Sequence, residues 1–372
     1  MFLEALKKEL LKNGSNYYTD NYDHYTFGVK KPLKKSFINQ LKRVFFSKPF
    51  LWVILSNNFL YRNFFLGFLF KYTKYIKPLE FFYDNLNSEE SKNLLIQLTA
   101  FRLLGYVKVR LPLSTPQYWE GIKEMENIAN TNESVEVRSF PWKLYLHDVD
   151  YTGYPIKVYL NSKAAYTTFI VKQYFKTINN IDLGPHKDDV VLDLGGCYGD
   201  TALQFGYVAG NKGKVYTFEF IPGNLEVMKK NLSLNPAIKD MVEIVEHPLW
   251  TTSGEKIYYK DAGAGSRVSF QQFEGSDGDI TTISVDDFVA KYNINKLDLI
   301  KADIEGAEPY VLKGAINSLK RFTPRLAITI YHSMGDFTGI IKQIADLNLG
   351  YKFYLGHYTI YASETVLYAV KE

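Results

Sequence analysis

The chain has 372 residues, which is long for one compact domain and comfortable for two. It is 46% hydrophobic and 23% charged, as in globular proteins, and its single cysteine excludes an internal disulfide and a zinc site built on clustered thiolates. The net charge is +4, but residues 1–80 hold 14 Lys and Arg against 5 Asp and Glu, so the rest of the chain is acidic on balance.

The basic excess lies beside a Phe-rich stretch at residues 41–77. This pattern fits an amphipathic surface for an anionic membrane or partner, and it also fits a helical subdomain that keeps its lysines in water. No nucleic-acid recognition motif accompanies the charge, so no nucleic-acid partner is expected. The N-terminus does not resemble a signal peptide, and residues 49–61 are too few for a membrane span of roughly 20 residues. We expect a cytoplasmic protein, with peripheral association at the inner face of the membrane left open.

Residues 1–35 are expected to form a polar arm, and residues 36–165 a mainly helical region. One helix is well marked within that region. Asn87 and Glu90 have the spacing of a capping box, a stripe of apolar residues follows, and Gly105 ends it.

Two stretches of alternating polarity, Lys143–Val149 and Tyr154–Leu160, predict strands of a hairpin or a small sheet. From residue 166 to 372 short apolar strands alternate with helices. This rhythm predicts an α/β domain with a doubly wound, mostly parallel sheet and an antiparallel closing strand. The expected strands are 190–194, 214–220, 241–247, 297–305, 326–332, 351–355 and 364–370.

Such sheets bind ligands beyond the carboxyl ends of their strands. In this chain the strand ends carry titratable groups: Asp193, Glu219, Glu246, Asp303, Glu305 and His332. A purely structural sheet has no reason to gather ionisable side chains on one edge. The sequence therefore predicts a functional site there.

The turn after the first strand indicates the kind of cofactor. A nicotinamide fingerprint that started at Gly195 would need glycines at the positions of Cys197 and Asp200. In addition, Asp193 and Asp200 would repel a diphosphate and attract a cation. S-adenosylmethionine carries an ammonium and a sulfonium, so it suits this turn.

In that interpretation Asp193 lies near the amino end of the methionine part. Gly195 and Gly199 let the backbone approach the ligand closely. Glu219 accepts hydrogen bonds from both ribose hydroxyls.

Three segments carry a family resemblance: DLGGCYGDTAL, FEFIPGNLEVMKKNLSLN and, most specifically, DLIKADIEGAEPYVLKGA. With LAITIYHSMGDF and ETVLYAV they make residues 165–370 resemble the FkbM family of S-adenosylmethionine-dependent methyltransferases. The chain departs from the family pattern at Phe220, where the family often has proline, and at Cys197, where a small residue is common.

The resemblance implies a class I methyltransferase (Rossmann-like) fold and O-methylation of sugars, polyketides or related hydroxyls. It makes residues 166–372 the methyltransferase domain and residues 36–165 an accessory region that shapes acceptor binding or docks to a membrane-bound glycan-assembly partner. The predicted cofactor-binding residues are Asp193, Gly195, Gly199, Asp200, Thr201, Glu219, Phe220 and Glu246. The predicted catalytic residues are Asp303, Glu305 and His332.

A hydroxyl acceptor needs a base or a metal ion to loosen its proton, and Asp303, Glu305 and His332 are the candidates. The two carboxylates have the chemistry to bind Mg²⁺ or a similar cation, or to serve cofactor and acceptor separately. We therefore predict an O-methyltransferase acting on a sugar, a nucleotide-linked sugar or a surface-polysaccharide intermediate. The alternatives are a polyketide, lipid-linked phosphate or amine acceptor, and a non-catalytic scaffold in a glycan-synthesis complex.

Overall fold

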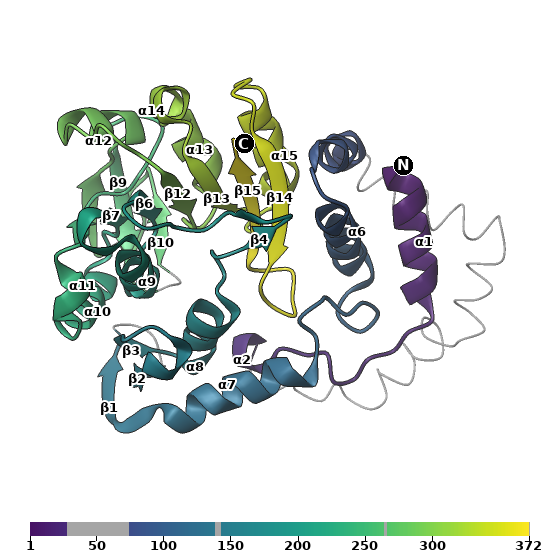
Figure 1. Ribbon diagram of the computed structural model, residues 1–372, viewed down its shortest axis with the longest axis horizontal. Helices are drawn as coiled ribbons and strands as arrows, with labels where there is room; N and C mark the ends of the chain where they lie inside the picture. Colours follow the sequence, from purple (N-terminus) through teal and green to yellow (C-terminus); the bar gives the residue numbers. More distant parts are fainter. Residues whose placement is uncertain (28–73, 138–142, 264–265, 372) are drawn as a thin grey trace. The chain divides into compact units, whose positions relative to one another are not determined.

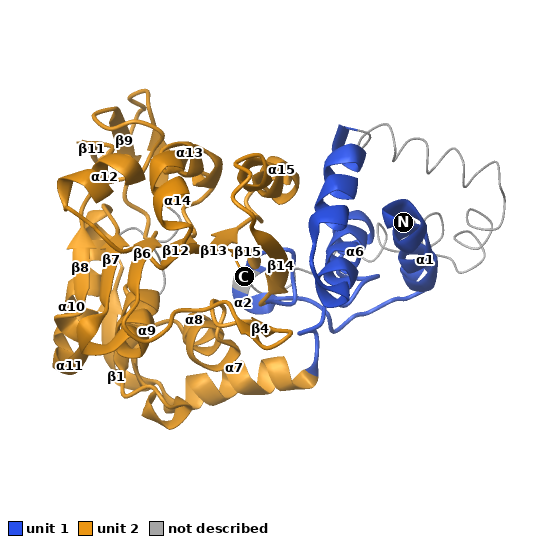
Figure 2. Cartoon of the chain, turned by 45° about the horizontal axis from the view of Figure 1, so that its top comes forward, with its two compact units in different colours: residues 1–115, 359–364 blue, residues 116–358, 365–372 orange. Residues whose placement is uncertain are grey.

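The computed structural model describes residues 1–27, 74–137, 143–263 and 266–371 (Figure 1). The chain divides into two compact units, which Figure 2 distinguishes by colour. The first comprises Met1–Thr115 and Thr359–Glu364, and the second comprises Pro116–Tyr358 and Thr365–Glu372.

The first unit begins with a helix where a loose polar arm was expected. Helix α1 (Phe2–Gly14) contacts α6 (Glu89–Leu104), and its Phe2 and Leu6 are buried. Only this narrow apolar face distinguishes α1 from a solvated segment, because the rest of its sequence is rich in lysine and glutamate. A short helix, α2 (His24–Phe27), follows.

Helix α6 confirms the best-marked helix of this region, with one correction at its start. The N-cap is Ser88, whose Oγ accepts a hydrogen bond from the Ser91 amide at 3.1 Å, and not Asn87. The helix ends at Gly105, which has a φ of 77°. Glycine adopts that conformation without the steric cost that other residues meet.

The segment Thr359–Glu364 belongs to the first unit although it lies near the end of the chain. The Tyr361 ring stacks on Tyr106, with centroids 5.4 Å apart, and meets Phe101 edge-on at the same distance. It also lies 4.7 Å from the Phe27 ring. The core of this unit is therefore assembled from the two ends of the sequence.

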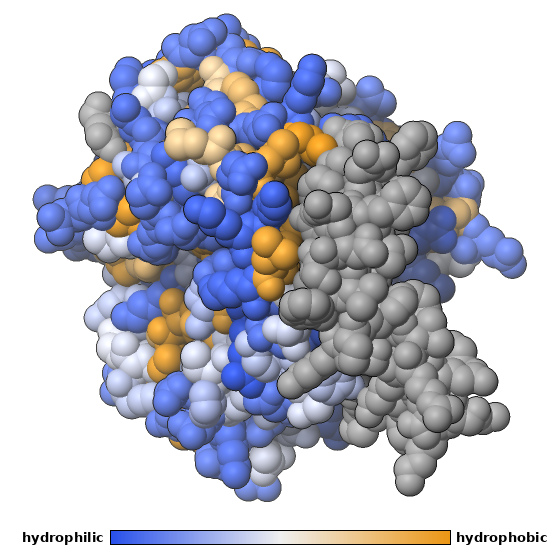
Figure 3. Space-filling view, turned by 90° about the vertical axis from the view of Figure 1, so that its right-hand side faces the viewer, coloured by the Kyte–Doolittle hydropathy of each residue, from blue (hydrophilic) through white to orange (hydrophobic). Residues whose placement is uncertain are grey.

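Most of the predicted basic aromatic stretch at residues 41–77 lies outside the described residues. Among the residues that are described, no helix is both long and apolar enough to cross a membrane. On the face drawn in Figure 3, the coloured surface is mainly hydrophilic, with hydrophobic residues in small separate groups.

The second unit contains a seven-stranded sheet with the order β14-β15-β13-β12-β6-β7-β8. β15 runs in the direction opposite to that of the other six strands. This confirms the predicted doubly wound, mostly parallel sheet with an antiparallel closing strand, and the strand order is that of the class I methyltransferase fold. The strands are β6 (Val190–Leu194), β7 (Lys214–Phe218), β8 (Val242–Val245), β12 (Leu299–Ala302), β13 (Arg325–Thr329), β14 (Lys352–His357) and β15 (Thr365–Val370).

Helices pack on both faces of this sheet, so its strands are short and mostly apolar (Figure 1). Helices α9, α10 and α11 contact one another, as do α12 with α14 and α13 with α15. Their bounds are α9 (Asp200–Ala209), α10 (Pro222–Ser233), α11 (Pro236–Lys239), α12 (Val285–Lys291), α13 (Glu308–Lys313), α14 (Ile316–Phe322) and α15 (Met334–Ala345).

Smaller elements come before the sheet in the sequence or between two of its strands. The two predicted strands are confirmed as β2 (Lys143–Asp148) and β3 (Lys157–Leu160), which form a small three-stranded sheet with β1. The further elements are α7 (Pro116–Ile128), β1 (Asn130–Glu136), α8 (Ser162–Ala165), the π-helix η2 (Tyr166–Val171), β4 (Thr177–Ile178), β5 (Ile181–Asp182), β9 (Lys256–Lys260), β10 (Arg267–Ser269) and β11 (Gly278–Thr281).

The predicted boundary between residues 165 and 166 does not coincide with a boundary between the two units. Residues 116–165 belong to the unit that contains the sheet. Whether they form a separate functional region stays a prediction.

Candidate functional site

Two charged residues interrupt the apolar strands at the centre of the sheet. The parallel register of β6 and β12 pairs Asp193 with Lys301. The Lys301 Nζ lies 2.9 Å from Asp193 Oδ1, and the two side chains are 3% and 0% exposed. Burial alone would lower the pKa of Lys301. The negative charges of Asp193 and Asp303 have the larger effect, so the pKa is raised. The two residues therefore form a buried ion pair.

The second oxygen of Asp193 is also engaged within the protein. Its Oδ2 accepts hydrogen bonds from Thr217 at 2.9 Å and Thr201 at 3.1 Å. The expectation that Asp193 attracts a cationic ligand is thus corrected, because its charge is balanced by Lys301 and its oxygens face protein donors. Thr201 supports this carboxylate.

The glycines of the following turn are required by the protein's own packing. Gly195 has a φ of 85°, and a Cβ there would lie 2.0 Å from the carbonyl oxygen of Asp303. Gly199 has a φ of 82°, and a Cβ there would lie 2.8 Å from Met228. The Lys301 Nζ donates a hydrogen bond to the Gly195 carbonyl at 2.7 Å, and this bond holds the turn against β12. The turn is therefore held in place before any ligand binds.

Cys197 lies in this turn, and two predicted acids, Asp200 and Glu219, lie near it. Burial raises the pKa of Cys197 well above its usual value, and the negative charges of Glu219 and Asp200 raise it further. The thiol therefore stays protonated and does not act as a nucleophile. Asp200, at the start of α9, accepts a hydrogen bond from the Thr168 hydroxyl at 2.7 Å. These two carboxylates keep the surroundings of the turn unfavourable for a diphosphate even though Asp193 is neutralised.

Glu219 directly follows β7 and is 7% exposed. Its Oε1 accepts from the amides of Phe220 and Ile221 at 2.7 and 2.8 Å, and its Oε2 accepts from Asn224 at 3.0 Å. A carboxylate offers about four acceptor positions, so about one remains. The protein's own donors therefore leave fewer acceptor positions than the two that the predicted ribose contact uses. Phe220 is half-buried, and its ring lies 6.1 Å from that of Tyr259.

Glu246 does not join this group. Strand β8 ends at Val245, and the Glu246 side chain, 51% exposed, pairs with Lys229. The prediction that Glu246 contacts the cofactor is corrected to a surface ion pair.

Asp303 follows β12 and is held by hydroxyl groups. Tyr174 donates to its Oδ2 at 3.0 Å, and Tyr331 and Thr329 donate toward its Oδ1 at 3.2 and 3.3 Å. Its side chain is 21% exposed. The carboxylate is therefore oriented by the protein and still reached by solvent.

Glu305 is the more open of the two predicted carboxylates. Its side chain is 69% exposed, and its Oε2 lies 3.6 Å from the Nε2 of His332. Its backbone has a φ of 57°, an uncommon conformation for a residue other than glycine, and Gly306 follows with a φ of 95°. Backbone of this kind is strained and tends to occur at functional sites.

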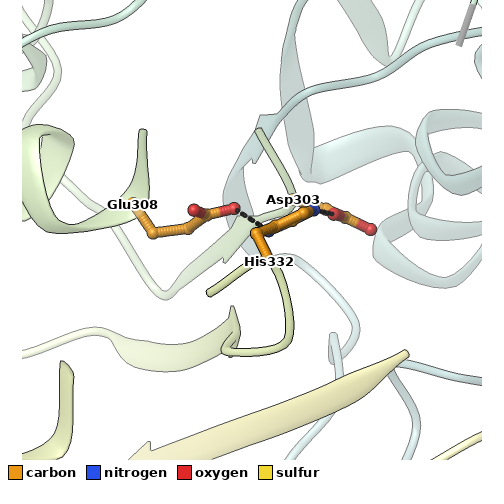
Figure 4. Close-up of side chains that lie close together, drawn as sticks. All are labelled: Asp303, Glu308 and His332. Carbon is orange, nitrogen blue, oxygen red and sulfur yellow. Dashed lines mark ion pairs between the residues drawn. The ribbon is translucent and has the colours of Figure 1, made fainter. Parts of the chain in front are cut away.

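His332 lies between carboxylates at the end of β13 (Figure 4). Its Nδ1 is 3.2 Å from Glu308 Oε1, and its Nε2 is 3.5 Å from Asp303 Oδ1. Burial lowers the pKa of His332, but Glu308, Asp303 and Glu305 outweigh this and raise it to about 9. The imidazole therefore carries a proton at neutral pH, which disfavours the predicted role of a base.

The raised pKa of His332 predicts a pH-dependent stability. The folded-state value of about 9 lies above the ordinary 6.5, so the charged imidazole stabilises the fold fully below pH 6.5. This contribution, on the order of 3 kcal/mol, is lost as the pH rises to 9. The free energy of unfolding is measured in urea with EDTA present. The difference between the wild type and His332→Gln should shrink as the pH rises from 6.5 to 9. A difference that is constant over this range would contradict the assignment.

Several residues of the site were missed from the sequence. Lys301 had a signal, since a charged residue inside an apolar strand needs a partner. Glu308 is fully buried and is the third acid of the segment DIEGAE. Tyr174 and Thr329 had no recognisable signal in the sequence, because hydroxyl-bearing residues are common in strands and loops.

Comparisons with known proteins show which proteins this chain is similar to. Residues 193–353 match the family model described as "Methyltransferase FkbM domain". A curated relative, the hexuronic acid methyltransferase AglP of Haloferax volcanii, is 28% identical over 163 residues. That match covers 44% of this chain and spans 64% of the length of the relative.

Two of the solved structures that resemble this chain are methyltransferase FkbM and fibrillarin. Methyltransferase FkbM from Methylobacillus flagellatus is 17% identical, with a TM-score of 0.49, over 80% of this chain and 60% of that one. Fibrillarin from Aeropyrum pernix, crystallised with natively bound S-adenosyl-L-methionine, is 14% identical, with a TM-score of 0.35, over 64% of this chain and 99% of that one.

Proposed function

Because residues 193–353 form an FkbM methyltransferase domain, we propose that this protein transfers the methyl group of S-adenosylmethionine to a hydroxyl of a sugar, a nucleotide-linked sugar or a surface-polysaccharide intermediate. The observation that carries the proposal is the placement of Asp200, Glu219, Asp303 and Glu305 beyond the carboxyl ends of β6, β7 and β12. In an open α/β sheet this edge is where ligands bind.

The glycine turn and Glu219 fit the cofactor. The turn is pre-formed, and about one acceptor position of Glu219 stays open for a ribose hydroxyl. Asp200 and Glu219 favour a ligand that carries positive charge. When bound, S-adenosylmethionine supplies a methyl group on a sulfonium, which is a good leaving group.

The remaining chemistry is alignment and removal of one proton. Glu305 is the best base among the predicted residues, since its carboxylate is exposed and is engaged only by an ion pair at 3.6 Å among the described residues. The acceptor oxygen forms the new bond to the methyl carbon as the carbon–sulfur bond breaks, and its proton passes to Glu305. Asp303, held by Tyr174 and Tyr331, positions the acceptor.

A sugar acceptor is supported by the relative AglP, whose name specifies hexuronic acid. The test has two steps. Calorimetric titration with S-adenosylhomocysteine asks whether the cofactor site exists, and we expect micromolar binding. Labelled S-adenosylmethionine is then offered with nucleotide-linked hexuronic acids, nucleotide-linked neutral hexoses and lipid-linked phosphates. Labelling of the lipid acceptors alone would replace the sugar proposal, and a folded protein without cofactor binding would refute the methyltransferase proposal.

Replacing Glu219 by glutamine is expected to weaken S-adenosylhomocysteine binding roughly 10- to 100-fold. The charged acceptor is lost, and hydrogen bonds to charged groups contribute about 1.5–3 kcal/mol. Isothermal titration calorimetry measures the change. The matched control is Glu246→Gln, which removes the surface carboxylate at the end of the neighbouring strand and should leave the affinity unchanged. Equal effects of the two variants would remove Glu219 from the cofactor site.

A further inference from the structure

Asp303, Glu308 and His332 form a compact group of metal-ligating side chains. Each offers one ligand atom, and these atoms all lie within 4.8 Å of one another. Figure 4 shows the imidazole between the two carboxylates, which come from opposite sides. Asp303 follows β12, Glu308 begins α13 and His332 lies three residues after the end of β13, so two neighbouring strands bring the group together.

The group has more acceptors than donors. The Thr329 hydroxyl has one proton, yet it lies 3.1 Å from the Ala302 carbonyl, 3.1 Å from Glu308 Oε1 and 3.3 Å from Asp303 Oδ1. At most one of these oxygens receives its hydrogen bond. Glu308 Oε1 also accepts from the Ile304 amide at 2.9 Å, and Asp303 Oδ1 accepts from Tyr331 at 3.2 Å.

Buried polar atoms in the group also lack hydrogen bonds. The Glu308 Oε2 is buried and has no hydrogen-bond partner among the described residues. The ring nitrogens of His332, whose side chain is only 9% exposed, form ion pairs with Glu308 and Asp303 at 3.2 and 3.5 Å but no hydrogen bond. Unsatisfied buried polar atoms are rare in native proteins and often mark an ion or water site. The lack of a hydrogen bond on the buried Glu308 Oε2 is evidence for a ligand in addition to the clustering of acidic residues.

We propose that Asp303, Glu308 and His332 bind one divalent transition-metal ion such as Mn²⁺. One imidazole nitrogen with two carboxylates is a mixed donor set, whereas Mg²⁺ and Ca²⁺ prefer oxygen alone. The ion satisfies Glu308 Oε2 and takes the place of a proton on one ring nitrogen of His332. This set differs from the predicted pair of Asp303 and Glu305 by using the buried Glu308, and it leaves Glu305 free.

The role of the ion rests on the proposed function. An acidic sugar would be repelled by Asp303, Glu305 and Glu308, and a metal ion offsets that repulsion. Bound to the ion, the acceptor hydroxyl loses its proton more readily, to Glu305, and its oxygen then takes the methyl group as the carbon–sulfur bond breaks. The ion orients only the acceptor. The proposed cofactor site at the glycine turn is made of other residues.

The test uses the full chain, stripped with EDTA and titrated with MnCl₂, with free Mn²⁺ measured by electron paramagnetic resonance. We expect one Mn²⁺ per chain, and at least a tenfold loss of affinity in Glu308→Gln and in His332→Gln. The matched control is Glu246→Gln, an acid at the end of a neighbouring strand, which should bind as the wild type does. Absence of binding, or equal binding by all variants, would overturn the proposal.

A second measurement does not depend on variants that fold. Electron spin echo modulation of the Mn²⁺-loaded wild type should show coupling to an imidazole nitrogen, and its absence would exclude His332 as a ligand. S-adenosylhomocysteine titration of the same sample separates this inference from the proposed function. Cofactor binding without Mn²⁺ binding refutes the metal site alone, and Mn²⁺ binding without cofactor binding refutes the methyltransferase proposal alone.

Discussion

Glu305→Gln is expected to lower kcat by about 10²–10⁴-fold, which is the usual contribution of a positioned general base. The amide keeps the size of the side chain but accepts no proton from the acceptor hydroxyl. S-adenosylhomocysteine affinity should change less than twofold, because Glu305 lies at the reacting end of the proposed site and Glu219 at the cofactor end.

Single-turnover methyl transfer, together with calorimetry, distinguishes these two effects. Glu246→Gln is again the matched control, and it should keep the wild-type rate. An unchanged rate in Glu305→Gln would remove this residue from the chemistry. A loss of cofactor affinity as large as the loss of rate would show that Glu305 acts on binding instead.

Lys301→Met is expected to destabilise the protein by about 3–5 kcal/mol. It leaves the carboxylate of Asp193 buried without its cation, and breaking a buried pair on one side costs about this much. Urea unfolding measures the loss. The double variant Asp193→Asn with Lys301→Met removes the uncompensated charge, so it should recover part of the stability.

Lys157→Met is the control for removing a lysine from an ion pair. Its partner is Asp148, and both side chains are more than half exposed, so little change is expected. If Lys301→Met were as mild as this control, the pair in the centre of the sheet would have no stabilising role. If the double variant were less stable than Lys301→Met alone, Asp193 would be held by Thr201 and Thr217 independently of the lysine.

The fold was largely predictable because its strands are buried on both faces. A short apolar run such as Val190–Leu194, followed by a glycine turn and a helix, has few other interpretations. Helix α1 was missed for the opposite reason. Its buried face is small, and a lysine-rich sequence gives little periodic signal unless its packing partner is known.

The sequence predicted which side chains follow the carboxyl ends of the strands but not the contacts that these side chains make there. Position in a strand indicates which residues reach the carboxyl end, whereas the partner of a charged side chain depends on register with a distant strand. Asp193 therefore appeared available to a ligand, although Lys301 lies beside it in β12. Glu246 failed differently, because β8 ends one residue earlier and the side chain turns to the surface.

The segment Thr359–Glu364 has a consequence for how the chain is made. During translation Phe101 and Tyr106 leave the ribosome long before Tyr361, the ring that stacks against them in the finished unit. The N-terminal unit therefore cannot close its aromatic core while the nascent chain is still short. Its folding is completed only after residues 359–364, which lie between β14 and β15, have been synthesised.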